Sequence, residues 1–408
     1  MILFYFLVGI MPLTDHRIWS QFVGELTVFK YVGAACVFYA LARLTTRQTV
    51  PTYFRTLQAR LLIGLYVIAG ASYLTRSLPT QFERSPLMSY TSFILLFFVT
   101  VSVIDSLSRL RWALLIAIGS VAFASLYVIR EWQKYHNVYA GFRPGWVVGD
   151  PNFFAISALL TLPLAFYLTL GARELWVRLF CAGCLLVTLL GITLGASRGG
   201  FLGLLAAFLF TVWHSQERLR NLALMGVLVL PLSALSPVSP VQRFLHPTSI
   251  EIDAVDTRTA VWRAGLHMMV AHPFIGVGLG NFKPMVLQYS RDDNPPDLIA
   301  HNAYIEIAAE MGLPALLFFL GILFFSYRGL SYARTRAIRA GLPFGWQAAV
   351  GLQAGLVGAA VAIFFVSGQY QKLLWLVIFL AMCVPELVHS SGHRFSERPN
   401  VAAAGNLA

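Results

Sequence analysis

HNAYIEIAAEMGLPALLFFLGILFF, residues 301–325, decides the fold because its apolar part is long enough to cross a lipid bilayer. An α-helix needs about 20 mostly apolar residues to span hydrocarbon that is about 30 Å thick. Every backbone N–H and C=O group inside the bilayer must be bonded within the protein, which makes the helix the unit of construction. The stretch opens with His301 and Asn302, and its only acidic residues are Glu306 and Glu310. It predicts a transmembrane helix with polar first turns.

The same apolar pattern recurs along the whole chain of 408 residues, which is 58% hydrophobic and only 12% charged, with a mean hydropathy of +0.70. A soluble domain carries about 25% charged residues, so a soluble protein is excluded. We expect an all-α, polytopic integral membrane protein with about twelve transmembrane helices. The apolar runs lie at residues 1–13, 22–42, 61–75, 87–104, 112–129, 153–170, 175–196, 200–213, 221–236, 303–326, 346–367 and 371–388.

The distribution of Lys and Arg along the chain predicts how these helices are oriented in the membrane. The net charge of +12 is carried by short segments between apolar runs, which indicates membrane topology rather than nucleic-acid binding. If both termini face the cytoplasm, the cytoplasmic segments hold about twice as many Lys and Arg as the short outer ones. The predicted organisation is transmembrane helices 1–9 over residues 1–237, a periplasmic loop over 238–300, helices 10–12 over 301–389 and a cytoplasmic tail over 390–408.

The long loop is expected to be ordered, because it holds aromatic and aliphatic residues at helical spacing. TRTAVWRAGLHMMVA, residues 257–271, follows an N-cap signal and stops before His272-Pro273, which predicts an amphipathic helix. GVGLGNF, residues 276–282, contains two Gly-x-Gly pairs, but no strand precedes them. These glycines therefore indicate turns rather than a dinucleotide-binding loop.

Two arginines are candidates for binding phosphate. Arg198 stands in Ser197-Arg198-Gly199-Gly200, a short outer turn at the membrane face, and Arg258 stands at the start of the predicted loop helix. A guanidinium has five fixed donors and keeps its charge, so two converging arginines would hold a diphosphate. The glycines would let a phosphate approach the backbone. The ordinary alternatives are a snorkelling loop arginine and a solvated helix arginine.

His301 is the candidate general base, because histidine titrates near neutral pH and this one stands where the loop re-enters the membrane. The alternative is a simple helix cap by Asn302, with His301 an interfacial residue. Glu306 or Glu310 would orient the histidine ring or bind the acceptor, or else form an interfacial polar face. No disulfide or metal site is expected, because the four cysteines lie in apolar runs.

Three further features have mainly structural interpretations. Asp150-Pro151-Asn152 opens an apolar run with an N-cap acid and a proline at the first helical position. Gly351, Gly355 and Ala359 form a small-residue ridge typical of close helix packing. Lys30 lies inside the second apolar run, where a lysine is a functional candidate or pairs with Glu25 or another helix.

Several stretches together resemble the bacterial O-antigen ligase and polymerase family over roughly residues 149–326. They are GDPNFFA at 149–155, SRGG at 197–200, TRTAVWRAG at 257–265, HPFIGVGLGNF at 272–282 and HNAYIEIAAEMGLPAL at 301–316. The sequence departs from the family pattern at Asp150, where the family has asparagine.

The resemblance implies a GT-C-like glycosyltransferase in the bacterial inner membrane, with its active site facing the periplasm. The donor would be a glycan on undecaprenyl diphosphate, the ligase acceptor would be a sugar hydroxyl of lipid A-core, and no cofactor, metal or nucleic acid would take part. Arg198 and Arg258 would bind the diphosphate, and His301 would deprotonate the acceptor. The further substrate-binding residues implied are Asn152, Trp262, Asn281, Asn302, Tyr304 and Glu306. Membrane lipids are the other expected partners of a monomeric protein.

Two alternatives stay open. A polymerase of the same family would use another lipid-linked repeat unit as acceptor. A transporter that flips a lipid-linked oligosaccharide would bind diphosphate with the same arginines and perform no chemistry. A transporter would be expected to show internal pseudo-symmetry, and none is visible in the sequence.

Overall fold

The computed structural model describes residues 1–13, 28–46, 52–76, 86–139, 142–145, 150–215, 217–235, 249–290 and 299–396, and within these ranges the regular structure is helical. The α-helices are α1 (Ile2–Ile10), α3 (Val28–Thr46), α4 (Leu57–Arg76), α5 (Pro86–Val103), α6 (Leu107–Tyr135), α7 (Pro151–Gly171), α8 (Leu175–Leu194), α9 (Arg198–Trp213), α10 (Arg218–Leu235), α12 (Ser249–Ala271), α13 (Phe282–Tyr289), α14 (Ala303–Arg339), α15 (Pro343–Ala362) and α16 (Lys372–Ser396). Short 3-10 turns are η1 (Met11–Leu13), η2 (Thr52–Arg55), η3 (Ile363–Phe365) and η4 (Gly368–Tyr370).

Nine of the described helices are long and apolar enough to cross a membrane: α3 to α8 and α14 to α16. Each of the twelve predicted runs has a helix, but α1 has 9 residues, α9 has 16 and α10 has 18, and these three are not among the nine. The chain is therefore a multi-pass membrane protein, and the number twelve stays a prediction.

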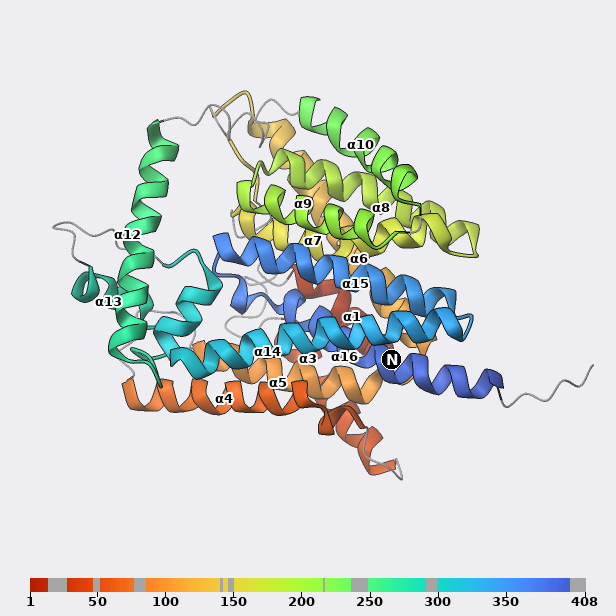
Figure 1. The fold of residues 1–408 in the computed structure, drawn as a ribbon, viewed down its shortest axis with the longest axis horizontal. Helices are drawn as coiled ribbons and strands as arrows, with labels where there is room; N and C mark the ends of the chain where they lie inside the picture. Colours follow the sequence, from red (N-terminus) through yellow and green to blue (C-terminus); the bar gives the residue numbers. More distant parts are fainter. Residues whose placement is uncertain are drawn as a thin grey trace, which may run out of the picture.

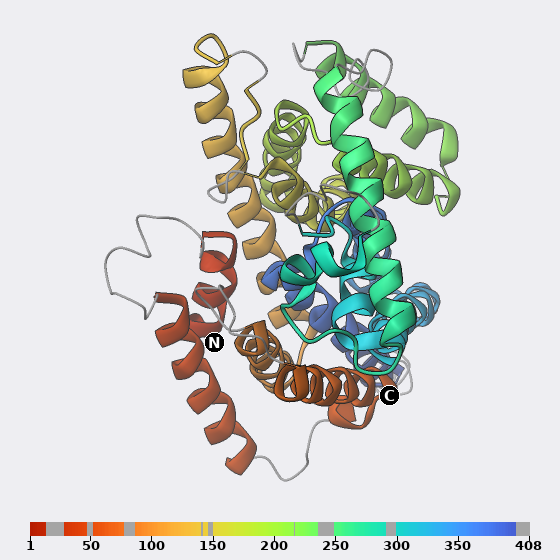
Figure 2. The ribbon, with the colours of Figure 1, turned by 90° about the vertical axis from the view of Figure 1, so that its left-hand side faces the viewer.

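Helix α12 lies across one end of the bundle. Figure 1 shows the long helices side by side, whereas α12 lies across one end of the bundle with α13 beside it. Figure 2 looks onto that end and shows α12 in front of the bundle. The predicted loop helix exists and ends at Ala271 as expected, but it begins at Ser249, eight residues before the predicted start.

The centre of the bundle is held by close contact between α7 and α15. A Cβ placed on Gly351 would lie 2.7 Å from the Leu164 Cα, and one on Gly355 would lie 2.9 Å from the Leu160 carbonyl oxygen. Glycine at these positions lets the two backbones approach, which provides dispersion contacts where lipid gives no hydrophobic drive for helix association. The predicted role of the ridge in packing is confirmed.

Helix α14 is broken at Gly312, which has a φ of +83°. Pro314 has no N–H, so the Glu310 carbonyl loses its helical donor and instead accepts bonds from the Gly278 N–H (3.1 Å) and the Ser72 hydroxyl (2.7 Å). The Leu313 N–H donates to the Pro273 carbonyl at 2.7 Å. Backbone groups freed by the break are thus satisfied inside the protein, as a membrane requires.

The segment that supplies these partners is the glycine-rich turn Pro273–Asn281. Gly276, Gly278 and Gly280 have φ values of +71°, +111° and +83°, a region that glycine enters without steric cost. The Val277 N–H also donates to the Ala309 carbonyl at 2.8 Å. The prediction that these glycines form turns is confirmed, and the turn is hydrogen-bonded to the broken segment of α14.

Gly276→Ala is expected to destabilise the protein strongly, because a Cβ there would lie 2.2 Å from the Glu310 carbonyl carbon. Gly341→Ala is the matched control, since Gly341 also has a positive φ (+62°) but no atom within 4 Å of its Cβ position. We expect the free energy of unfolding to fall by about 1–2 kcal/mol in the control, from backbone strain alone, and by clearly more in Gly276→Ala. Thermal unfolding in detergent measures both, and equal losses would contradict the packing argument.

Helix α16 continues to Ser396, so the first seven residues of the predicted tail are helical. Arg336 of α14 pairs with His389 of α16, one residue before the predicted tail begins. The rest of the tail, residues 397–408, lies outside the described residues, as do residues 236–248 and 291–298 of the predicted loop.

Candidate functional site

His301 occupies a strained backbone position between two residues that are fixed in place. Its φ is +47°, and such a conformation costs a non-glycine residue about 1–2 kcal/mol. On one side the Ala300 carbonyl accepts a bond from Trp262 Nε1 at 2.8 Å. On the other side Asn302 caps α14 by accepting bonds from the Tyr304 and Ile305 N–H groups, at 3.0 and 3.1 Å. The surrounding contacts therefore hold His301 in the strained conformation.

The environment of the His301 ring favours its neutral form. Its Nδ1 atom is buried and has no hydrogen-bond partner among the described residues. Burial lowers the pKa of His301, the positive charge of Arg258 lowers it further, and the negative charge of Asp150 acts in the opposite direction. The ring is thus uncharged at neutral pH and has a nitrogen that can accept a proton.

Asp150 and Arg198 lie at the starts of two helices that are joined by a side-chain bond. Asp150 caps α7 by accepting a bond from the Asn152 N–H at 2.7 Å, which confirms the predicted N-cap. The Asn152 Oδ1 in turn accepts a bond from the Ser197 hydroxyl at 2.6 Å. The Ser197 Oγ accepts one from the Gly200 N–H at 3.0 Å, so Arg198 is the first residue of α9.

The two glycines after Arg198 serve packing rather than access for a ligand. A Cβ on Gly199 would lie 2.8 Å from the Phe365 Cβ, and one on Gly200 would lie 2.5 Å from the Ala155 Cβ. The space over both backbones is therefore filled by protein. The expectation that these glycines expose the backbone to a phosphate is wrong, which leaves the Arg198 side chain as the group in this turn suited to bind one.

The 3-10 turn η3 joins the elements that carry the predicted residues. Phe365 packs on Gly199 of α9, and the Phe364 ring lies 5.3 Å from the Trp262 ring of α12. The Phe364 ring is also 6.3 Å from the Tyr304 ring of α14, whose hydroxyl donates to the Ala360 carbonyl at 2.7 Å. Arg258 stands one turn before Trp262 on α12. The starts of α9 and α14 therefore meet α12 around η3, and the start of α7 is linked to that of α9 by the bond between Asn152 and Ser197.

Glu306 and Glu310 are buried acceptors that hold two separate segments against α14. Glu306 accepts bonds from the Ser367 hydroxyl and from Gln369 Nε2, the latter at 2.8 Å. Glu310 accepts bonds from the Phe282 N–H and the Tyr370 hydroxyl, each at 3.2 Å. Both carboxylates are thus engaged within the protein. Their observed contacts position the chain around the site, and the interfacial polar face considered for them is not found.

Asn281 is buried next to Phe282, whose N–H donates to Glu310. It is 1% exposed, and its side-chain Nδ2 donates to the Val277 carbonyl at 3.2 Å within the glycine-rich turn. Six residues predicted to bind substrate make hydrogen bonds within the protein: Asn152, Trp262, Asn281, Asn302, Tyr304 and Glu306. In the structure, these bonds hold neighbouring segments of the chain in place.

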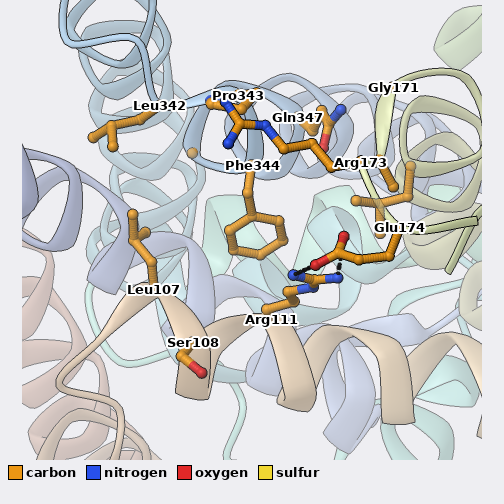
Figure 3. A pocket seen from close by; sticks show the side chains of 13 residues that line it. Leu107, Ser108, Arg111, Gly171, Arg173, Glu174, Leu342, Pro343, Phe344 and Gln347 are labelled. Carbon is orange, nitrogen blue, oxygen red and sulfur yellow. Dashed lines mark hydrogen bonds and ion pairs between the residues drawn. The ribbon is translucent and has the colours of Figure 1, made fainter.

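A cavity of about 340 Å³ lies at the opposite end of the bundle, between the starts of α6 and α15 and the turn from α7 to α8. Figure 3 shows its polar lining, in which Arg111 reaches Glu174; their closest N–O distance is 2.6 Å. None of the predicted site residues lines it. Glu174 neutralises Arg111, and Arg173 is a second arginine in the lining.

Asp150→Asn is expected to move the acid limb of the activity profile to lower pH. The Asp150 carboxylate favours the charged form of His301 and raises its pKa. Removing that charge lowers the pKa, so the His301 ring stays neutral at more acidic pH. Asparagine caps a helix about as well as aspartate, so the unfolding temperature should change little. Initial rates between pH 4 and 8 test this, and a shift to higher pH would contradict the assignment.

Comparison with known proteins finds a match in the part of the chain that contains most of the candidate site residues. No curated protein shows a significant match. Residues 182–320 match the family model described as O-antigen ligase, and this range contains Arg198, Arg258, His301 and both buried acids. The matched range also includes α12, the glycine-rich turn and the break in α14. This part of the chain, residues 182–320, is therefore similar to the O-antigen ligase family.

Proposed function

We propose that the protein is an O-antigen ligase that transfers a glycan from undecaprenyl diphosphate to a sugar hydroxyl of lipid A-core. The observation that carries the proposal is the neutral, strained His301, beside Arg258 and the capped helix start that precedes Arg198. Among the described residues, only His301 and Ala196 are non-glycine residues with positive φ, and Ala196 stands two residues before Arg198. Strain of this kind clusters at functional sites, where the surrounding fold holds it.

In the proposed reaction the acceptor oxygen attacks the anomeric carbon from the face opposite the diphosphate. The bond from that carbon to the diphosphate oxygen breaks with its electron pair, and the configuration inverts. The acceptor hydroxyl gives its proton to the His301 ring, whose lowered pKa keeps it unprotonated at neutral pH. Arg198 and Arg258 bind the departing diphosphate, and their preorganised charge stabilises the transition state.

The test combines the purified protein with polyprenyl-diphosphate glycan and lipid A-core and separates the lipids on a gel. Glycosylated lipid A-core is the expected product, and it should appear without added metal or nucleotide. If only longer donor-linked chains form, the polymerase activity replaces the ligase proposal. If both lipids stay unchanged while the glycan crosses the membrane in proteoliposomes, the protein is a transporter. The site would face the periplasm of the bacterial inner membrane.

A further inference from the structure

The cavity of Figure 3, at the end of the bundle away from His301, contains a buried amide that has no partner among the described residues. This amide belongs to Gln347, the fifth residue of α15, which is 3% exposed and lines the cavity. A Cβ placed on Gly171, the last residue of α7, would lie 2.4 Å from the Gln347 Nε2. Buried amides are nearly always hydrogen-bonded, so this one indicates a polar ligand or water in the cavity.

The start of α15 adds backbone donors to the same cavity. Its N-cap residue, Leu342, provides no side-chain bond, and Pro343 has no N–H to bond. The N–H groups of Phe344 and Gly345 lie in the first turn, where a helix has no acceptor for them, and both residues line the cavity. Helices α6 and α8 also begin here. The positive ends of three helix dipoles therefore favour an anion in this cavity.

The charged side chains of the lining leave an excess of positive charge. They are Arg111, Arg173 and Glu174, so two arginines face one carboxylate. Figure 3 shows Arg111 bonded to Glu174, whereas the Arg173 side chain extends beside Gln347 and makes no ion pair with the other residues drawn. The bond from Arg111 is the main cause that lowers the pKa of Glu174, and the Arg173 charge acts in the same direction. The guanidinium of Arg173 thus remains available to a ligand.

Two exposed tryptophans place the cavity at the level of lipid headgroups. Trp112 follows Arg111, and Trp176 lies two residues after Glu174. Their rings stack with centres 5.8 Å apart and are 45% and 50% exposed. Exposed tryptophans of a membrane protein are typical of the interface between hydrocarbon and water. A headgroup at this depth is therefore beside the cavity.

We propose that the cavity of Figure 3 binds a phosphate group, held by the Gln347 amide, the Arg173 guanidinium and the N–H groups at the start of α15. Guanidinium groups and helix starts are common phosphate ligands in proteins. Two sources of phosphate fit this chemistry: the headgroup of a phospholipid and the free ion. The position beside the two tryptophans favours the headgroup. The site is separate from the proposed transferase site and does not depend on that function.

Binding of dioctanoyl phosphatidylglycerol to the purified full chain, in an uncharged detergent, is measured by native mass spectrometry. Arg173→Gln should weaken this binding about tenfold or more, because it removes the charged fork that has no protein partner among the residues drawn in Figure 3. Arg339→Gln is the matched control: Arg339 is the exposed last residue of α14, close to the start of α15 in sequence, and it does not line the cavity. The control should bind as the wild type does.

Gln347→Leu separates a role in binding from a role in folding. Leucine has a similar size, and it removes a buried polar group that has no partner among the described residues, so the unfolding temperature should stay equal or rise. Binding of phosphatidylglycerol should nevertheless fall. A lower unfolding temperature with unchanged binding would show that the amide serves the fold, and it would contradict the proposal.

Inorganic phosphate distinguishes the two sources. If millimolar phosphate does not displace the lipid, and the lipid depends on Arg173 and Gln347, the phosphate group is that of a headgroup. If phosphate displaces the lipid and itself depends on both residues, the cavity holds the free ion. The proposal is overturned if neither probe binds the wild type, or if the wild type, Arg173→Gln and Gln347→Leu bind both probes equally.

Discussion

His301→Ala should abolish glycan transfer while leaving the binding of the lipid-linked donor nearly unchanged. A positioned base contributes about 10²- to 10⁴-fold to such a reaction, and alanine has no group that can accept the proton. The donor would still find Arg198 and Arg258, because neither arginine depends on the His301 ring for its place in α9 or α12. Transfer is measured as glycosylated lipid A-core, and donor binding is measured separately with labelled polyprenyl-diphosphate glycan.

The matched control is His214→Ala. His214 caps the far end of α9, where its ring Nδ1 lies 3.0 Å from the Phe210 carbonyl oxygen, so this variant loses a histidine away from the proposed site. Alanine at position 301 keeps the left-handed backbone under the same strain, which makes a folding loss the main alternative explanation. Equal unfolding temperatures for the two variants exclude it. Full transfer by His301→Ala would remove histidine from the mechanism.

Arg258→Gln should lower transfer by about a hundredfold and also move its acid limb to higher pH. Loss of the guanidinium removes a charged, bidentate contact to the diphosphate, and electrostatic groups of this kind contribute about 10²- to 10³-fold. The pH effect follows from His301: the Arg258 charge lowers its pKa, so removing that charge raises the pKa. More alkaline solution is then needed to obtain the neutral base.

Arg258→Lys separates these two effects. Lysine keeps the positive charge, so the acid limb should stay close to that of the wild type. It lacks the planar fork, so transfer should still fall by about tenfold or more. Rates between pH 4 and 9 for the wild type and both variants provide the comparison. An unchanged acid limb in Arg258→Gln would show that Arg258 does not act on His301, and unchanged turnover in Arg258→Lys would count against contact with the diphosphate.

Local sequence signals predicted the helices and their caps well. The capping of α7 by Asp150 and of α14 by Asn302 depends on neighbouring residues, and both caps are present. The start of α12 was predicted wrongly, because the Asp256-Thr257 pair resembles an N-cap and yet lies inside a longer helix. A capping signal shows where a helix can begin, whereas the helix extends further if earlier residues also favour it.

The partners of the buried acids could not be read from the sequence. Ser367 and Gln369 bond Glu306 across 61 and 63 positions, and Tyr370 bonds Glu310 across 60. No short-range pattern links residues so far apart. The break in α14 did leave a signal, since Gly312 and Pro314 interrupt an otherwise uniform apolar run. What remained hidden was that the turn containing Val277 and Gly278 supplies the missing hydrogen bonds.

The sequence by itself determined that this chain is a helical, multi-pass membrane protein, because hydrocarbon admits only long apolar segments with internally bonded backbones. It also singled out Arg198 and His301 at the ends of such segments, and Arg258 in the long loop between them. Only the tertiary structure decided that His301 is neutral and strained, that Arg258 and Asp150 act on it, and that η3 joins the elements around it. Burial, charge proximity and backbone strain depend on distances between residues far apart in the chain, and folding alone sets those distances.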